Sequence, residues 1–195
     1  AMISHVDKRV GNIIQTLKDN GLYENTIIIF AGDNGLAVGQ HGLMGKQNVY
    51  EHSVGVPLMI KAAAQHTGKK TADLCYLIDV FPTLCDMLQL PVPQSVDGIS
   101  LLSSLDGKEP VRDYLYYSYM DNQRGISDGT WKLIEYHVNG KRTTQLFNLK
   151  NDPWERNDLS GQKKYEKTIQ RLREKMAEEQ KRTNDTSVFW NNFSY

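Results

Sequence analysis

The chain has 195 residues, and its 23 basic and 23 acidic side chains give a formal net charge of zero. This balance gives no indication of nucleic-acid binding or of attraction to an anionic membrane. No apolar run approaches the roughly 20 residues that span a bilayer, and no signal peptide is evident. The two cysteines, Cys75 and Cys85, lie ten apart without a metal-binding spacing, which predicts buried thiols rather than a disulfide or a zinc site.

The first third of the chain has the pattern of an α/β protein. Apolar residues at helical spacing predict an amphipathic helix over residues 6–17, and Gly21 favours its left-handed end. Two apolar runs, 26–31 and 56–60, predict strands buried on both faces. Helix, strand, loop and strand in this order favour a largely parallel sheet. A sheet of so few strands would have uncovered edges and faces. We therefore expect further strands upstream and expect that Ala1 is not the natural N-terminus.

Residues 73–90 have the apolar spacing of a further helix, which Pro82 breaks or restarts. From about residue 112 the sequence becomes aromatic and β-branched over 114–119, 131–136 and 143–149. Turns at Gly129 and at Asn139–Gly140 between these runs predict an antiparallel meander. A turn at 152–155 and a charged amphipathic helix over 165–180 complete the chain.

The loop over residues 33–52 carries the residues best suited to chemistry. It follows the carboxyl end of a predicted strand, where open α/β sheets bind ligands, and its glycines admit a ligand close to the backbone. Asp33 and Asn34 offer two oxygen donors, which suit Ca²⁺ or Mg²⁺. Calcium takes about six to eight oxygens, so the others must come from outside this chain. Asp-Asn-Gly alone also forms a plain turn, but its position favours a site.

Residues 26–60 resemble the second signature region of type I sulfatases in the alkaline phosphatase superfamily. In that family a buried strand is followed by Asp-Asn-Gly, Gly-x-His-Gly, a lysine, Tyr-Glu and Val-Pro-Leu. This chain has all of these elements in order, namely Asp33–Gly35, Gly39–Gly42, Lys46, Tyr50–Glu51 and Val56–Leu58. Looser similarity continues to the end of the chain in four segments: 79–84, 97–101, 131–134 and 146–153.

The resemblance implies a fold in two parts. Residues 1–110 would be the C-terminal portion of an alkaline-phosphatase-like α/β domain, and 111–195 a small α+β subdomain with an antiparallel sheet and a C-terminal helix. It also implies that Asp33 and Asn34 bind Ca²⁺, with Mg²⁺ as the weaker candidate. Lys46 would contact the sulfate and offset charge on the leaving alkoxide. His41 would either face the substrate or be bonded within the loop, while Tyr50 and Glu51 would brace the loop.

Two features depart from the family pattern. The formylglycine nucleophile is made within Cys/Ser-x-Pro/Ala-x-Arg, and neither Cys75 nor Cys85 lies in such a motif. We therefore expect formylglycine in a missing N-terminal part, which would be the chain's partner, and no turnover by this chain alone. Many relatives also carry arginine where this chain has Gly55.

The function that the resemblance implies is hydrolysis of sulfate esters, with a sulfated small molecule or glycan as substrate, and a periplasmic or secreted location. Two alternatives stay open: a phosphonate or phosphodiester hydrolase of the same superfamily, and a non-catalytic interaction module.

Overall fold

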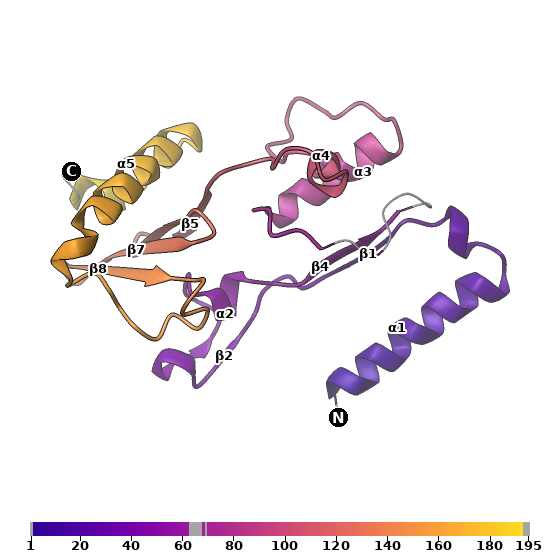
Figure 1. Ribbon diagram of the computed structural model, residues 1–195, viewed down its shortest axis with the longest axis horizontal. Coiled ribbons are helices and arrows are strands. Elements are labelled where there is room, and N and C mark those ends of the chain that lie inside the picture. The colour runs from indigo at the N-terminus through magenta and orange to yellow at the C-terminus, as the bar shows by residue number, and fades with distance from the viewer. Residues whose placement is uncertain (1, 63–67, 69, 193–195) are drawn as a thin grey trace. The chain divides into compact units, whose positions relative to one another are not determined.

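The computed structural model describes residues 2–62, 68 and 70–192, and these fall into two compact units (Figure 1). The first unit contains the segments 1–31 and 57–70, and the second contains 32–56 and 71–195. The boundary expected near residue 110 stays a prediction. Among the described residues, no helix combines the length and the apolar character that crossing a membrane requires.

The first unit contains helix α1 (Met2–Asp19), a 3-10 turn (Tyr23–Asn25) and the strands β1 (Ile28–Ala31) and β4 (Leu58–Lys61). The predicted helix and its glycine end are confirmed, since Gly21 has a φ of 66°. The expected parallel pairing is wrong for these two strands, because β1 and β4 are antiparallel with Ile28 opposite Lys61. An apolar run fixes burial but not strand direction. The prediction that β1 is buried on both faces is also wrong, since its residues are half-buried or exposed.

The second unit begins with the loop that the sequence singled out. Strands β2 (Ala37–Val38) and β3 (Met44–Gly45) form a short antiparallel pair around a 3-10 turn (Gln40–Gly42), and the one-turn helix α2 (Glu51–Val54) follows.

Helix α3 (Val80–Met87), preceded by a 3-10 turn (Leu77–Asp79), is shorter than the predicted helix over 73–90. The buried Asp79 carboxylate accepts the backbone N–H of Tyr76 at 2.7 Å and pairs with Arg112, which keeps the preceding residues extended. Pro82 lies in the first turn of α3, where a missing N–H does no harm, in agreement with a helix that starts there. Helix α4 (Leu102–Leu105) follows.

The predicted meander is confirmed as a four-stranded antiparallel sheet in the order β5-β6-β7-β8. Its strands are β5 (Leu115–Tyr119), β6 (Gln123–Ser127), β7 (Trp131–Val138) and β8 (Lys141–Asn148). Strand β6 was not predicted. The charged helix is also confirmed as α5 (Glu166–Arg182), between 3-10 turns at Lys163–Tyr165 and Val188–Asn192.

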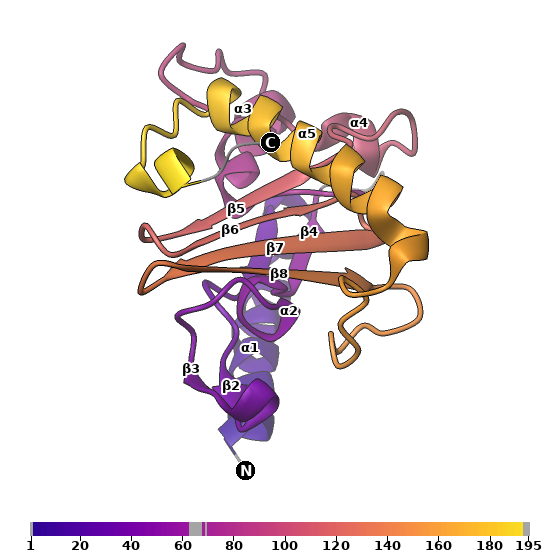
Figure 2. The same cartoon turned by 90° about the vertical axis from the view of Figure 1, so that its left-hand side faces the viewer.

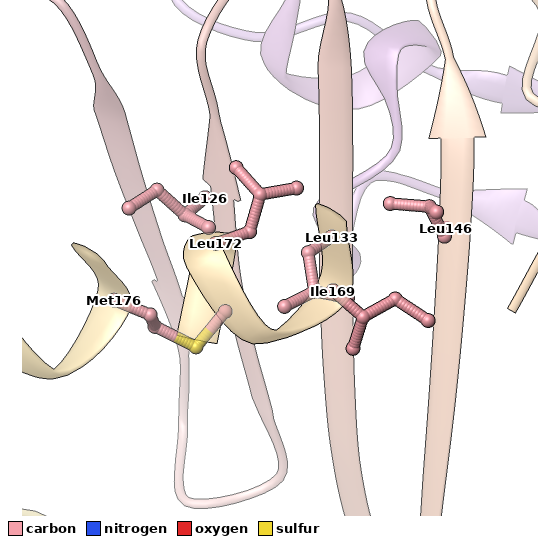
Figure 3. Packing of buried hydrophobic residues seen from close by; sticks show 6 residues of the cluster. All are labelled: Ile126, Leu133, Leu146, Ile169, Leu172 and Met176. Atoms are coloured by element: carbon pink, nitrogen blue, oxygen red, sulfur yellow. The ribbon is translucent and has the colours of Figure 1, made fainter. Parts of the chain in front are cut away.

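The sheet packs against different elements on its two faces because successive side chains of a strand point in opposite directions. Helix α5 lies across one face (Figure 2). The apolar core on that face consists of Ile126, Leu133, Leu146, Ile169, Leu172 and Met176 (Figure 3). On the other face a second cluster consists of Val49, Tyr50, Ile134 and Phe147. The loop of residues 33–55 is thus attached to the sheet on the face opposite α5.

Candidate functional site

Two of the predicted site residues lie together at the surface of the second unit. The Nζ atom of Lys46 is 3.6 Å from Oδ2 of Asp33, and the two side chains are 48% and 88% exposed. Exposed pairs of this kind contribute at most about 1 kcal/mol to stability. The contact therefore places an ammonium group beside a carboxylate without serving as a structural bridge.

Asn34 is oriented by helix α2. Its Nδ2 donates to the backbone oxygen of Ser53 at 2.9 Å, and the N–H of Gly35 donates to the same oxygen at 2.9 Å. Only the nitrogen of an amide side chain can donate to a carbonyl, so the Asn34 oxygen points away from this bond. Gly35 is required here, because a Cβ at this position would lie 2.0 Å from the backbone oxygen of His52.

The donors at this position fit a hard cation in kind but not in number. The Asp33 carboxylate and the Asn34 amide oxygen are ligands that Ca²⁺ prefers. Within the parts of the chain that the structure describes, no group of three or more His, Cys, Asp or Glu side chains could hold a metal ion. The loop therefore offers two oxygen donors, fewer than calcium takes, and calcium binding by Asp33 and Asn34 stays a prediction.

His41 is held inside the loop. Its backbone has a φ of 53°, and its ring stacks on Tyr50 with centroids 4.0 Å apart and an angle of 7° between the planes. Its Nε2 lies 3.1 Å from the backbone oxygen of Trp154 and must donate to it. His41 thus stacks on Tyr50 of the loop, but its hydrogen bond goes to the turn after β8, and both alternatives for His41 stay predictions.

Tyr50 and Glu51 brace the loop as expected. The Tyr50 hydroxyl donates to Oε1 of Gln145 at 2.7 Å, and the backbone N–H of Glu51 donates to Oε2 of Glu155 at 2.6 Å. Both partners belong to the C-terminal part of the chain. The loop is therefore fixed to the meander and to the turn that follows it.

A buried lysine beneath the loop was not predicted from the sequence. Lys132 of β7 is fully buried, and its Nζ lies 2.7 Å from Oε1 of Glu51 and 3.0 Å from Oε1 of Glu155. The ammonium also lies 4.9 Å from the ring centroid of Tyr117. Burial raises the pKa of Glu155, and the Lys132 ammonium only partly opposes this effect. A lysine between apolar residues in the run 131–134 was the available signal.

Gly55 borders the same cluster. A Cβ at Gly55 would lie 2.8 Å from the backbone oxygen of Glu51 and 3.0 Å from its Oε2. The Glu51 carboxylate thus comes close to a residue that carries no side chain here, and its cationic partner is Lys132. A substitution at Gly55 would displace Glu51.

A small cavity of about 280 Å³ lies beside His41. The lining residues come from the loop and the turn after β8, namely Gln40, Glu51, His52, Gly55, Pro153, Trp154 and Glu155. Trp154 is 64% exposed at its rim. Burial, and then His41 and Lys132, lower the pKa of His52, so its ring is neutral at physiological pH. The cavity is therefore lined in part by the aromatic rings of His52 and Trp154.

Comparison with known proteins identifies the class. Residues 39–182 match the family described as N-sulphoglucosamine sulphohydrolase, C-terminal. An N-acetylglucosamine-6-O-sulfatase from Bacteroides thetaiotaomicron is 30% identical over 95% of this chain and 35% of its own length. A structure solved with its substrate D-glucosamine-2-N,6-O-disulfate superposes with a TM-score of 0.81 at 28% identity, over 96% of this chain and 40% of that one. Phosphonate monoester hydrolase of Agrobacterium radiobacter gives a TM-score of 0.77 at 28% identity, over 91% and 39%.

The chain belongs to the sulfatase family of the alkaline phosphatase superfamily, and it corresponds to the C-terminal region of these enzymes. It spans about a third of the length of the curated sulfatase relative and two fifths of the solved structures. The part of the fold that precedes it in these relatives has no counterpart in these 195 residues.

Proposed function

We propose that this chain supplies half of the active site of a sulfatase that hydrolyses sulfate esters of carbohydrates. The observation that carries the proposal is the approach of the Lys46 ammonium to the Asp33 carboxylate at 3.6 Å, beside Asn34, in a chain of this family. A cation-binding carboxylate and a sulfate-binding ammonium must lie near each other to act on one ester group.

Each residue has a separate role in this proposal. Asp33 and the Asn34 oxygen hold Ca²⁺, which, when bound, acts as a Lewis acid on the sulfate group. Lys46 contacts a sulfate oxygen and offsets the negative charge that develops on the leaving alkoxide. His41 follows Gln40, which lines the cavity of 280 Å³, and its Nε2 donates a hydrogen bond to the backbone oxygen of Trp154. The formylglycine nucleophile belongs to the upstream part of the complete protein.

The apolar surface of the first unit supports the existence of such an upstream part. A groove of about 690 Å³ runs between α1, β1 and β4, and its lining is predominantly apolar. Its exposed apolar residues are Met2, Ile3, Val6, Phe30 and Met59. Apolar patches of this kind mark surfaces that another segment covers, and we propose that upstream strands of the sheet cover this one.

The choice of ester is supported by the relatives. The curated relative described above is a sulfatase of N-acetylglucosamine, and one solved structure holds a disulfated glucosamine. Phosphonate monoester hydrolysis is the second candidate, because a hydrolase of that class is as similar in sequence, at 28% identity, as the structure with the sugar bound.

The test uses the complete protein that contains this chain. Purified wild type is assayed on an aryl sulfate and on an aryl phosphonate monoester, together with Lys46→Ala. Loss of an electrostatic group of this kind costs about a hundredfold or more in turnover, so kcat on the aryl sulfate should fall by that factor. Lys108→Ala is the matched control, because Lys108 forms an exposed pair with Asp106 at 3.0 Å elsewhere in the second unit. Faster turnover of the phosphonate, or full activity of Lys46→Ala, would contradict the proposal.

A further inference from the structure

Lys132 and Glu155 hold the same residue from two sides. Lys132 binds the Glu51 side chain at 2.7 Å, while Glu155 accepts the Glu51 backbone N–H at 2.6 Å and pairs with Lys132 at 3.0 Å. The Lys132 side chain is fully buried, and that of Glu155 is 1% exposed. We call Lys132, Glu155 and Glu51 the buried ion cluster. It fixes the first residue of helix α2 in both position and orientation.

Helix α2 connects the buried ion cluster to the loop residues of the proposed site. The helix is a single turn, closed by the bond from the Gly55 N–H to the Glu51 oxygen at 2.8 Å. Its fully buried Ser53 presents the backbone oxygen that accepts both Asn34 Nδ2 and the Gly35 N–H. A displacement of Glu51 would therefore move the acceptor that orients Asn34.

We infer that Lys132 is a positioning residue for the cation site: with Glu155 it holds α2 so that Ser53 presents Asn34 to Ca²⁺. The inference rests on the proposed function of the loop. Lys132 itself touches neither Asn34 nor Asp33 in this arrangement, so it acts only through Glu51 and α2.

A purely structural role explains the buried ion cluster less well. A buried ion pair is rarely more stabilising than apolar residues of the same size, because desolvation offsets most of the attraction. The neighbouring residues Ile134 and Phe147 on this face already form an apolar contact with Val49 and Tyr50. A leucine at position 132 would extend that contact, whereas a lysine adds directional contacts to the carboxylates of Glu51 and Glu155. Partners that orient metal ligands from outside the site typically change affinity by 10–100-fold.

The same strand provides a matched control. Glu135 of β7 is also fully buried, and its Oε1 accepts a bond from Nε of Arg173 at 2.7 Å. It lies on the α5 face of the sheet, whereas Lys132 lies on the loop face. Glu135→Gln thus weakens a buried ion pair in the same strand without touching Glu51. Lys132→Met keeps the length of the side chain and removes the ammonium.

The first measurement is hydrogen–deuterium exchange by mass spectrometry on the complete protein, over peptides that cover residues 34–55. Lys132→Met should speed exchange of the amides of Gly35 and Glu51 at least tenfold, whereas Glu135→Gln should leave them as in wild type. Equal exchange in the two variants overturns the inference. Should Lys132→Met not fold, Glu155→Gln retains size and an acceptor oxygen, and it should change the same amides in the same direction; no change there overturns the inference as well.

The second measurement is calcium dependence, read both as the calcium-induced rise in Tm and as the calcium concentration that gives half-maximal hydrolysis of an aryl sulfate. Lys132→Met should raise that concentration at least tenfold and reduce the rise in Tm, with Glu135→Gln unchanged. Faster exchange at Gly35 with an unaltered calcium requirement overturns the inference. A wild-type protein without sulfatase activity or calcium response would instead contradict the proposed function, and the exchange data would still decide whether Lys132 orders the loop.

Discussion

Replacement of Gly35 by alanine tests the contact between the loop and α2. The added Cβ would lie 2.0 Å from the backbone oxygen of His52, so the backbone at 35 must move away. That movement breaks the two bonds to the Ser53 oxygen, one from the Gly35 N–H and one from Asn34 Nδ2. A hydrogen bond contributes about 1 kcal/mol net, so the unfolding free energy should fall by about 2 kcal/mol. For a protein of this size, 1 kcal/mol corresponds to about 2–4 °C, which gives a fall in Tm of about 4–8 °C.

Thermal unfolding followed by circular dichroism measures this effect directly. Gly161→Ala is the control, because nothing lies within 4 Å of the Cβ that it would introduce. In the complete protein, Gly35→Ala should also raise the calcium concentration needed for activity, since Asn34 loses its orientation. If Gly35→Ala and Gly161→Ala unfold at the same temperature, the close approach of Gly35 to α2 is refuted.

Three further outcomes follow from the structure. Partial burial would raise the pKa of Asp185, but bonds from Arg124 and Tyr116 outweigh it and lower the pKa. A carboxyl group whose pKa is lower in the folded state than its unfolded value of about 3.9 stabilises the fold above that pH, and this stabilisation is lost as the pH falls. Asp185→Asn removes this contribution, so its urea midpoint should fall less than that of wild type below about pH 4. Trp154→Ala at the cavity rim should raise KM for a sulfated disaccharide more than for an aryl sulfate; equal changes would exclude a glycan contact. Calorimetry should detect weak or no calcium binding by this chain alone, because two donors are too few, and a tight site lost in Asp33→Ala would contradict this expectation.

Elements with a clear period were predictable from the sequence. Helix α5 buries Ile169, Leu172 and Met176, the three residues on which its prediction depended. The turn at Asn139–Gly140 has φ values of 51° and 73°, which these residue types permit at low energetic cost. Local preference and tertiary packing agree at these positions, so pattern alone was sufficient.

Elements that depend on distant partners were not predictable. Strand β6 was not predicted because its buried residues include Arg124 and Ser127, whose polar side chains indicate a loop in the sequence. The buried guanidinium of Arg124 pairs with Asp185, which lies 61 positions away. The helix predicted over 73–90 is longer than the observed one for a similar reason, since the pairing of Asp79 with Arg112 holds the first residues of that range extended.

The same division applies to the candidate site. Asp33 and Lys46 could be selected from the sequence because both lie in one loop, and the structure brings them to 3.6 Å. Lys132 and Glu155 were not selected, because their contacts with Glu51 come from 81 and 104 positions away and no local motif contains them together. Residues that act directly on a ligand gather in motifs, whereas the residues that support them are scattered along the chain.

If Asp33 and Lys46 bind the oxyanion as proposed, selectivity between sulfate and phosphonate esters must arise outside this pair. Both esters present a tetrahedral group with a single negative charge, so one cation and one ammonium serve either equally well. The similarity of this chain to hydrolases of both kinds agrees with such a shared half-site. The groups that can differ are those that meet the leaving alcohol, and we expect the cavity lined by Gln40 and Trp154 to be such a surface. Replacement of the turn at 152–155 by that of a relative should therefore change the preferred leaving alcohol more than the preference between sulfate and phosphonate esters.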